Sequence, residues 1–268
     1  MPFAKIRGQN IHYVDSGGSG PVVLLSHGFL MDHRMFSHQV DALGPDFRVV
    51  AWDERGFGKT EFDGQPFTYW DSADDALALL DHLHIDRAIF GGMSQGGFLS
   101  MRAALRAPER VAGLILISTQ AGTDGPEILV GYRQMLETWA SVGPVQPLLE
   151  SIATIILGTD RAHWEPWMTD WRARPNDALI HPAGCLLDRD DITSRVAEIR
   201  CPAIVFHGTA DQAISMSRAE QLASLLPDCR GMVKVEGAAH AANLTHPEQV
   251  NPAFVDFCKA LAPSLKSS

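Results

Sequence analysis

The chain has 268 residues, of which 46% are hydrophobic and 20% charged. A chain of this length buries roughly three quarters of its unfolded surface, so it needs neither disulfides nor a structural metal, and disorder is excluded except at the ends. The net charge of −10 argues against nucleic acid or an anionic membrane as a partner, because both require a basic surface.

In chain order, short apolar strands alternate with helical patterns. Residues 3–7 and 10–15 predict a hairpin, and the continuous apolar run at 22–25 is typical of a strand buried on both faces. Further strands are expected at 47–52, 87–90, 113–117, 203–205 and 232–235, and helices at 33–43, 68–84 and 98–106. Such alternation is typical of a parallel sheet with helices on both faces.

A serine stands on the turn between one of these strands and the next helix, in the motif Gly92-Met93-Ser94-Gln95-Gly96. The glycines two residues before and after Ser94 allow a tight, strained bend that a Cβ would obstruct, and this bend exposes the hydroxyl. The motif in this setting predicts a nucleophile elbow with Ser94 as the nucleophile.

The alternation stops near Gln120 and resumes near Ala203, and the stretch between them is rich in helix formers and tryptophan. We therefore expect a core domain at 1–121 and 197–268 with a helical cap inserted at 122–196. The cap's aromatic and methionine side chains are expected to roof a pocket over Ser94; alternatively, the tryptophans pack only the cap's own core. The residues predicted to bind substrate are Leu30, Trp139, Trp164 and Trp167.

A serine hydroxyl is a poor nucleophile at its ordinary pKa, so it requires a base and a group that orients the base. Asp211 follows the apolar run at 203–205, and His240 lies on a loop after the strand expected at 232–235. These are the predicted acid and base, with Asp124 as a reserve candidate for the acid. Possible capping boxes at 217–220 and 245–248 predict the starts of two C-terminal helices.

The order serine, acid, histidine differs from that of chymotrypsin-like and subtilisin-like proteases. Together with Ser26-His27-Gly28-Phe29 after a strand and the motif at 53–58, it makes the chain resemble an α/β-hydrolase over nearly its whole length. The resemblance implies an α/β-hydrolase fold: a mostly parallel eight-stranded sheet flanked by helices, with an inserted helical cap. Within this family, the chain resembles serine esterases and enol-lactonases.

The negative oxygen of a tetrahedral intermediate needs two preorganised donors. The backbone N–H of Gln95 is one by the geometry of the elbow, and the resemblance to the family's His-Gly-x loop implies that of Phe29 as the second. Leu30 is the substitute if the register of that loop differs. His27 is expected to be a structural residue of the loop rather than a base.

The motif Asp53-Glu54-Arg55-Gly56-Phe57-Gly58 has acids near a strand end, which would also suit a metal or acid–base site. The resemblance implies instead a structural turn in which Asp53 and Arg55 satisfy one another and the backbone. The remaining histidines, among them His12 and His33, are expected at the surface or in the cap. We predict no metal and no cofactor.

A serine at the elbow excludes relatives that carry aspartate there, namely epoxide hydrolases and haloalkane dehalogenases. The predicted reaction is hydrolysis of a small carboxylic ester or lactone through an acyl-enzyme on Ser94, with His240 activating water. The alternatives are a C–C bond (meta-cleavage product) hydrolase, a cofactor-free haloperoxidase or perhydrolase, and a hydrolase-like receptor for a small ligand.

The four cysteines, at 185, 201, 229 and 258, show no Cys-x-x-Cys pair and no cysteine–histidine spacing typical of zinc. They predict reduced, mostly buried thiols. Residues 1–9 lack the apolar core of a signal peptide, and no segment approaches the ~20 apolar residues of a membrane span. We therefore expect a cytoplasmic protein, a monomer or small homo-oligomer, with a small-molecule substrate and no membrane partner.

Overall fold

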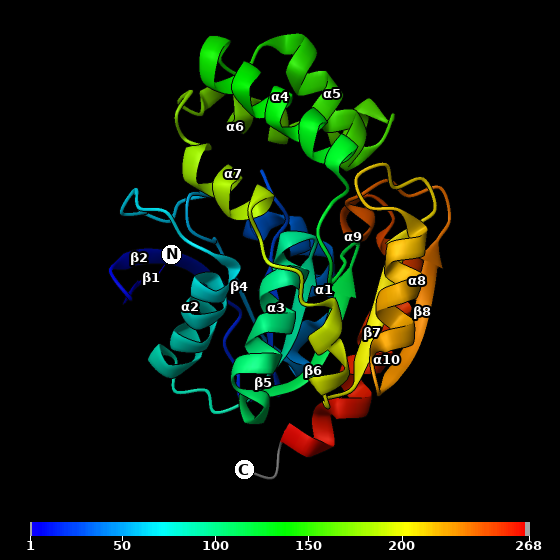
Figure 1. The fold of residues 1–268 in the computed structure, drawn as a ribbon. Helices are drawn as coiled ribbons and strands as arrows, with labels where there is room; N and C mark the ends of the chain where they lie inside the picture. Colours follow the sequence, from blue (N-terminus) through cyan, green and yellow to red (C-terminus); the bar gives the residue numbers. More distant parts are fainter. Residues whose placement is uncertain (1, 266–268) are drawn as a thin grey trace.

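Residues 2–265, the part of the chain that the computed structural model describes, contain an eight-stranded sheet in the order β1-β2-β4-β3-β5-β6-β7-β8 (Figure 1). Its strands are β1 (Phe3–Ile6), β2 (Gln9–Asp15), β3 (Val22–Ser26), β4 (Arg48–Trp52), β5 (Ala88–Met93), β6 (Val111–Ile117), β7 (Ala203–Gly208) and β8 (Cys229–Val235). The pairs β1–β2 and β2–β4 are antiparallel, and every later pair in this order, from β4–β3 to β7–β8, is parallel.

The central strands are apolar because both of their faces are covered. Every residue of β5 and β6 is buried, as expected for parallel strands between two helical layers. In β3, Val23 and Leu25 belong to one hydrophobic core and Leu24 to the other, because successive side chains of a strand point to opposite faces. The predicted α/β-hydrolase sheet is thus confirmed.

Helices cover both faces of this sheet. The core helices are α1 (Ser37–Leu43), α2 (Tyr69–His82), α3 (Gln95–Arg106), α8 (Met216–Leu225), α9 (Ala242–Thr245) and α10 (Pro247–Leu261). The buried residues of α1 and α10 belong to one core, and those of α2, α3 and α8 belong to the other. The two apolar layers hold the strand ends, and the loops that follow them, in fixed positions.

Four further helices lie between β6 and β7 in the chain and form a group beyond the carboxyl ends of the parallel strands (Figure 1). They are α4 (Pro126–Val142), α5 (Gln146–Leu157), α6 (Trp167–Ala173) and α7 (Ile180–Leu187). All four fall within 122–196, the stretch expected to form a cap. Their position places them over the edge of the sheet where the loops after β3, β5 and β7 meet.

The two predicted capping boxes are not formed. α8 starts at Met216 after Ser215, two residues earlier than expected, and no side chain caps it. Thr245 is the last residue of the short helix α9, and its hydroxyl donates back to the carbonyl of Ala241. Because α9 occupies 242–245, α10 begins only at Pro247, whose missing N–H suits a first helical position.

Candidate active site

Ser94 occupies the sharp turn between β5 and α3. Its backbone has φ 51° and ψ −113°, a conformation that a non-glycine residue rarely adopts. The turn is held by hydrogen bonds from the Ser94 amide to the Ile117 carbonyl (2.9 Å) and from the Thr119 hydroxyl to the Ser94 carbonyl (2.8 Å). A Cβ at Gly96 would collide with the Ser26 carbonyl, so this position requires glycine.

Asp211 and His240 lie on the loops that follow β7 and β8, at the same edge of the sheet as Ser94. The His240 ring bonds through Nδ1 to Asp211 Oδ2 at 2.8 Å. The other carboxylate oxygen, Oδ1, accepts the amides of Ala213 (2.8 Å) and Ile214 (3.0 Å), which fixes the carboxylate's orientation.

The environment of Asp211 favours its ionised form. Burial would raise the pKa of the Asp211 carboxyl, but the His240 ring, its hydrogen bond and the Ile214 amide outweigh burial, so the pKa lies below its ordinary value. His207, which the sequence did not single out, lies beside it. The His207 ring bonds to the Ile214 carbonyl (2.9 Å) and lies 3.5 Å from Asp211 Oδ2, and it thereby braces the loop from within the core.

Ser94 and His240 line the same cavity. Its apolar lining residues are Phe29, Leu30, Met93, Phe98, Met135, Ile152, Ile155, Ile156, Leu186, Ala213 and Ile214. The Ser94 hydroxyl makes no hydrogen bond to the His240 ring in this structure. Catalytic hydrogen bonds are often long before substrate binds and tighten in the complex.

The structure corrects the expected roof of this pocket. Leu30 lines it, but Trp139, Trp164 and Trp167 do not. Trp139 is buried within the helical group, Trp164 donates from Nε1 to the Gly158 carbonyl (3.0 Å), and Trp167 lines a separate cavity. The roof consists instead of Met135 of α4, three isoleucines of α5 and Leu186 of α7, which line the cavity together with Ser94. The period of the α5 isoleucines was the signal available in the sequence.

Asp124, the reserve acid, forms no hydrogen bond or ion pair with His240. Its carboxylate accepts the side chains of Gln120 (2.7 Å) and Arg189 (2.9 Å), and it forms part of the wall of the same cavity. Asp211 is therefore the carboxylate that stands behind His240.

Two backbone amides lie near the elbow. Gln95 is the first residue of α3, so its N–H has no partner within the helix and lies at the positive end of the helix dipole. Phe29 follows Gly28 on the loop after β3, and β3 pairs directly with β5 through Ser26 and Gly92. Leu30 has φ 64° on the same loop. The sheet thus holds the loop beside the elbow.

His27 is fully buried, and both of its ring nitrogens have backbone partners. Nδ1 bonds to the Gly28 carbonyl (2.8 Å), and Nε2 accepts the amide of Glu54 (2.9 Å). Burial lowers the pKa of His27, so the ring is neutral at pH 7. It joins the loop after β3 to the loop after β4 and is not placed to act on a ligand.

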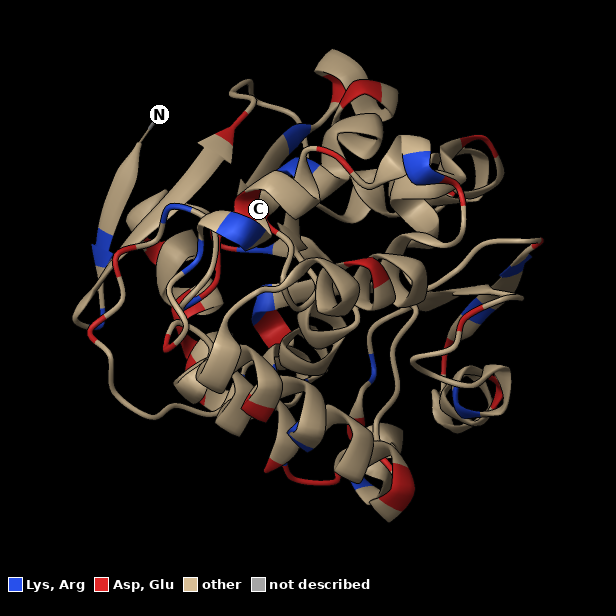
Figure 2. Ribbon diagram, turned by 90° about the horizontal axis from the view of Figure 1, so that it is seen from above, with Lys and Arg blue, Asp and Glu red and all other residues tan. Residues whose placement is uncertain are grey.

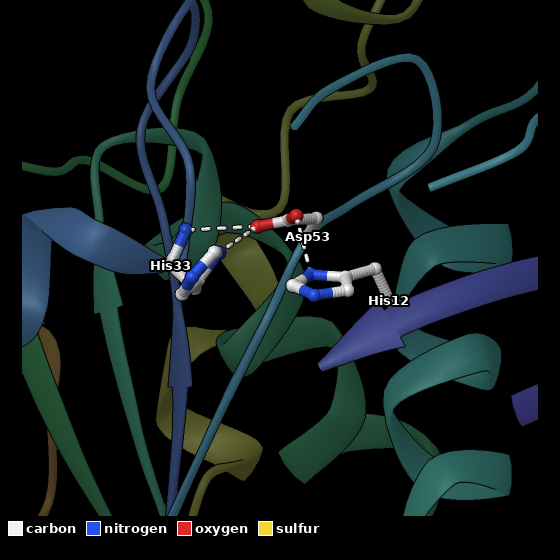
Figure 3. A group of neighbouring side chains, drawn as sticks. All are labelled: His12, His33 and Asp53. Carbon is white, nitrogen blue, oxygen red and sulfur yellow. Dashed lines mark hydrogen bonds and ion pairs between the residues drawn. The ribbon is translucent and has the colours of Figure 1, made fainter. Parts of the chain in front are cut away.

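Asp53 lies between two histidine rings (Figure 3). Oδ2 faces His12 Nδ1 at 2.8 Å and accepts the Lys59 amide (2.9 Å); Oδ1 faces His33 Nδ1 at 2.7 Å and accepts the His33 amide (2.9 Å). These three side chains bring potential metal-ligand atoms within 4.8 Å of one another. The rings, however, point at different oxygens of one carboxylate, which is the geometry of a hydrogen-bonded cluster.

This cluster corrects two expectations. His12 is completely buried rather than at the surface. Arg55 does not pair with Asp53: its guanidinium forms a bidentate, buried pair with Asp75 of α2. Asp53 instead accepts hydrogen bonds from the two histidine rings and two backbone amides.

Acidic and basic residues are interspersed around the molecule (Figure 2). Among residues 2–265, no helix is both long and apolar enough to cross a membrane. The four cysteines are free thiols; Cys185 and Cys258 are buried, and the other two are partly buried.

Comparison with known proteins places this geometry in context. A family model described as alpha/beta hydrolase fold matches residues 21–247. A putative carbamate hydrolase, RutD, from Rhizobium rhizogenes is 29% identical over 259 residues, covering 89% of this chain and 92% of the relative. A thermophilic esterase from Thermogutta terrifontis has a TM-score of 0.88 and 27% identity, covering 98% of this chain and 100% of that one. The enol-lactonase from Burkholderia xenovorans LB400 has a TM-score of 0.87 and 27% identity, covering 96% and 100%.

Proposed function

We propose that this chain, which belongs to the α/β hydrolase fold family, hydrolyses small carboxylic esters or lactones through an acyl-enzyme on Ser94. One observation carries the proposal: His240, held by Asp211 at 2.8 Å, lines the same apolar cavity as Ser94 at the strained turn. An apolar cavity with few polar groups suits a small neutral substrate.

In this mechanism, His240 Nε2 takes the proton of the Ser94 hydroxyl as the oxygen attacks the acyl carbon. Asp211 holds the ring so that Nδ1 carries a proton, and its ionised carboxylate stabilises the imidazolium that forms. The Ser94–His240 hydrogen bond forms when substrate fills the cavity. His240 then protonates the leaving alcohol and activates the water that releases the acid.

The amides of Phe29 and Gln95 supply the donors for the oxyanion, with Leu30 on the same loop. Each such donor contributes ~2.7–4 kcal/mol to a site of this kind. The segment at 122–196 acts as the cap, whose helices α4, α5 and α7 exclude water from the acyl group. The cap's side chains therefore decide which acyl and alcohol groups are accepted.

The test is a panel of p-nitrophenyl esters of increasing acyl length, with lactones, a carbamate, a C–C cleavage substrate and a perhydrolysis assay, run on wild type and on Ser94→Ala. We expect multiple-turnover hydrolysis of short-acyl esters that Ser94→Ala abolishes. Activity that persists in Ser94→Ala contradicts the mechanism. A single turnover followed by tight ligand retention would instead indicate a receptor.

A further inference from the structure

The cavity over Ser94 contains two polar side chains that the proposed mechanism does not use. Asp124 lies just before α4, and Tyr132 lies within it. Both line the cavity together with the apolar side chains of α4 and α5. In a cavity of this kind, a few placed polar groups set the orientation and identity of the ligand.

Asp124 is held rigidly. Gln120 Nε2 donates to Oδ1 at 2.7 Å and Arg189 to Oδ2 at 2.9 Å, and the Asp124 and Arg189 side chains are only 9% and 2% exposed. Each carboxylate oxygen has one donor from this network and keeps acceptor capacity. The Arg189 guanidinium lies 4.5 Å from the centre of the Phe98 ring, so it is fixed by packing as well.

Stability alone does not explain this pair. Burying two charges carries a large desolvation penalty, and well-packed apolar residues often replace such a pair without loss of stability. Here the network is also incomplete, because Arg189 Nε and Gln120 Oε1 are buried with no hydrogen-bond partner. Asp124 is the member of this network that lines the cavity, so the network holds a carboxylate with spare acceptor capacity in the cavity wall, where a ligand can use it.

Tyr132 offers the complementary group. Its hydroxyl reaches the Ala213 carbonyl only at 3.5 Å, the outer limit of a hydrogen bond. Burial, followed by the charges of Asp124 and Asp211, raises the pKa of Tyr132 to about 12, so the phenol is protonated at neutral pH. It is therefore a donor whose present partner is weak and readily exchanged.

We infer that Tyr132 and Asp124 form a subsite for a neutral hydroxyl group on the acyl chain of the substrate. This inference rests on the proposed ester hydrolysis at Ser94. The substrate hydroxyl donates to Asp124 and accepts from Tyr132, which a hydroxyl can do with one atom. Arg189 already neutralises Asp124, so a cation gains little, and an anion meets the Asp124 carboxylate. A plain alkyl chain gives Asp124 no further donor and gives Tyr132 no better acceptor than the Ala213 carbonyl, so it gains neither hydrogen bond of the subsite.

The experiment compares methyl hexanoate with methyl 3-hydroxyhexanoate and methyl 6-hydroxyhexanoate by acid release. We expect wild type to prefer one hydroxy ester by about tenfold in kcat/KM, the effect of one to two net hydrogen bonds. In Tyr132→Phe and Asp124→Asn, this ratio falls to below about threefold. Glu137→Gln, exposed on the same helix and outside the cavity lining, is the matched control and keeps the wild-type ratio.

The outcomes separate this inference from the proposed function. Hydrolysis of methyl hexanoate with no preference for either hydroxy ester, or a preference that both variants retain, overturns the subsite alone. If wild type hydrolyses none of the esters, ligand binding tests the subsite instead. The measurement is the rise in the unfolding temperature of Ser94→Ala with hexanamide and with 3- or 6-hydroxyhexanamide. A larger shift with a hydroxy amide that disappears in Ser94→Ala/Tyr132→Phe supports the subsite, and equal shifts overturn it.

Discussion

Replacing Asp53 by asparagine tests whether the buried cluster of His12, Asp53 and His33 is a main source of stability. Each oxygen of Asp53 accepts one imidazole and one backbone amide. An asparagine has only one oxygen, so its NH₂ group must face two of these four donors. In one orientation of the amide, the NH₂ group faces His12 Nδ1 and the Lys59 amide.

The expected loss follows from those two contacts. Hydrogen bonds to a charged group contribute about 1.5–3 kcal/mol each, so losing two near the lower limit gives a loss of about 3 kcal/mol, or roughly 100-fold in the unfolding equilibrium. Urea unfolding followed by the fluorescence of the six tryptophans measures this change. For a chain of this size, it corresponds to a lower midpoint by about 1 M urea.

The dependence on pH adds a second condition. Burial would raise the pKa of the Asp53 carboxyl, but the His33 hydrogen bond and the nearby His27 and His33 rings outweigh it, so the pKa is well below its ordinary value. A carboxyl of lowered pKa contributes stability above its unfolded pKa, and this contribution is lost as pH falls through the folded pKa. The difference between wild type and Asp53→Asn should therefore begin to shrink as pH falls below about 4 and continue to shrink at lower pH.

The matched control is Asp41→Asn, because Asp41 is exposed on α1. It should change the free energy of unfolding by less than about 0.5 kcal/mol. A loss below about 1 kcal/mol for Asp53→Asn at pH 7, or a loss that does not shrink on acidification, would refute the assigned role of the carboxylate.

Three further changes test other parts of the structure. Glu54 is buried, and burial raises its pKa well above the ordinary value, so its contribution is present below the unfolded pKa and lost as pH rises through the folded pKa; Glu54→Gln should raise the free energy of unfolding at pH 8, by up to about 1.36 kcal/mol per pH unit between those values, and not at pH 4. Asp211→Asn should lower kcat/KM for p-nitrophenyl acetate by about 10⁴-fold while Asp188→Asn, at an exposed position, does not, and comparable losses in both would contradict the proposed triad. Gly96→Ala should abolish folding or activity because its Cβ meets the Ser26 backbone, whereas Gly184→Ala, with open space around it, should unfold at an equal or higher temperature.

The strands, the elbow and the order of the catalytic candidates were predictable because their signals are local. An apolar run such as β6 has few alternatives to a buried parallel strand, and glycines on both sides of Ser94 mark a turn in which side chains collide. The positions of Asp211 and His240 follow from strand ends, because parallel strands bring their carboxyl ends to one edge of a sheet.

Partners distant in the chain depend on packing instead. The sheet decides which loops come together. It therefore decides that Asp53 contacts His12 and His33 and that Arg55 pairs with Asp75. Likewise, the rotation of each helix between β6 and β7 about its own axis decides whether its tryptophans or its isoleucines line the cavity with Ser94. These helices pack against several neighbours, and each neighbour favours apolar side chains. Periodicity identifies an apolar face, but only the assembled fold determines which neighbour that face meets.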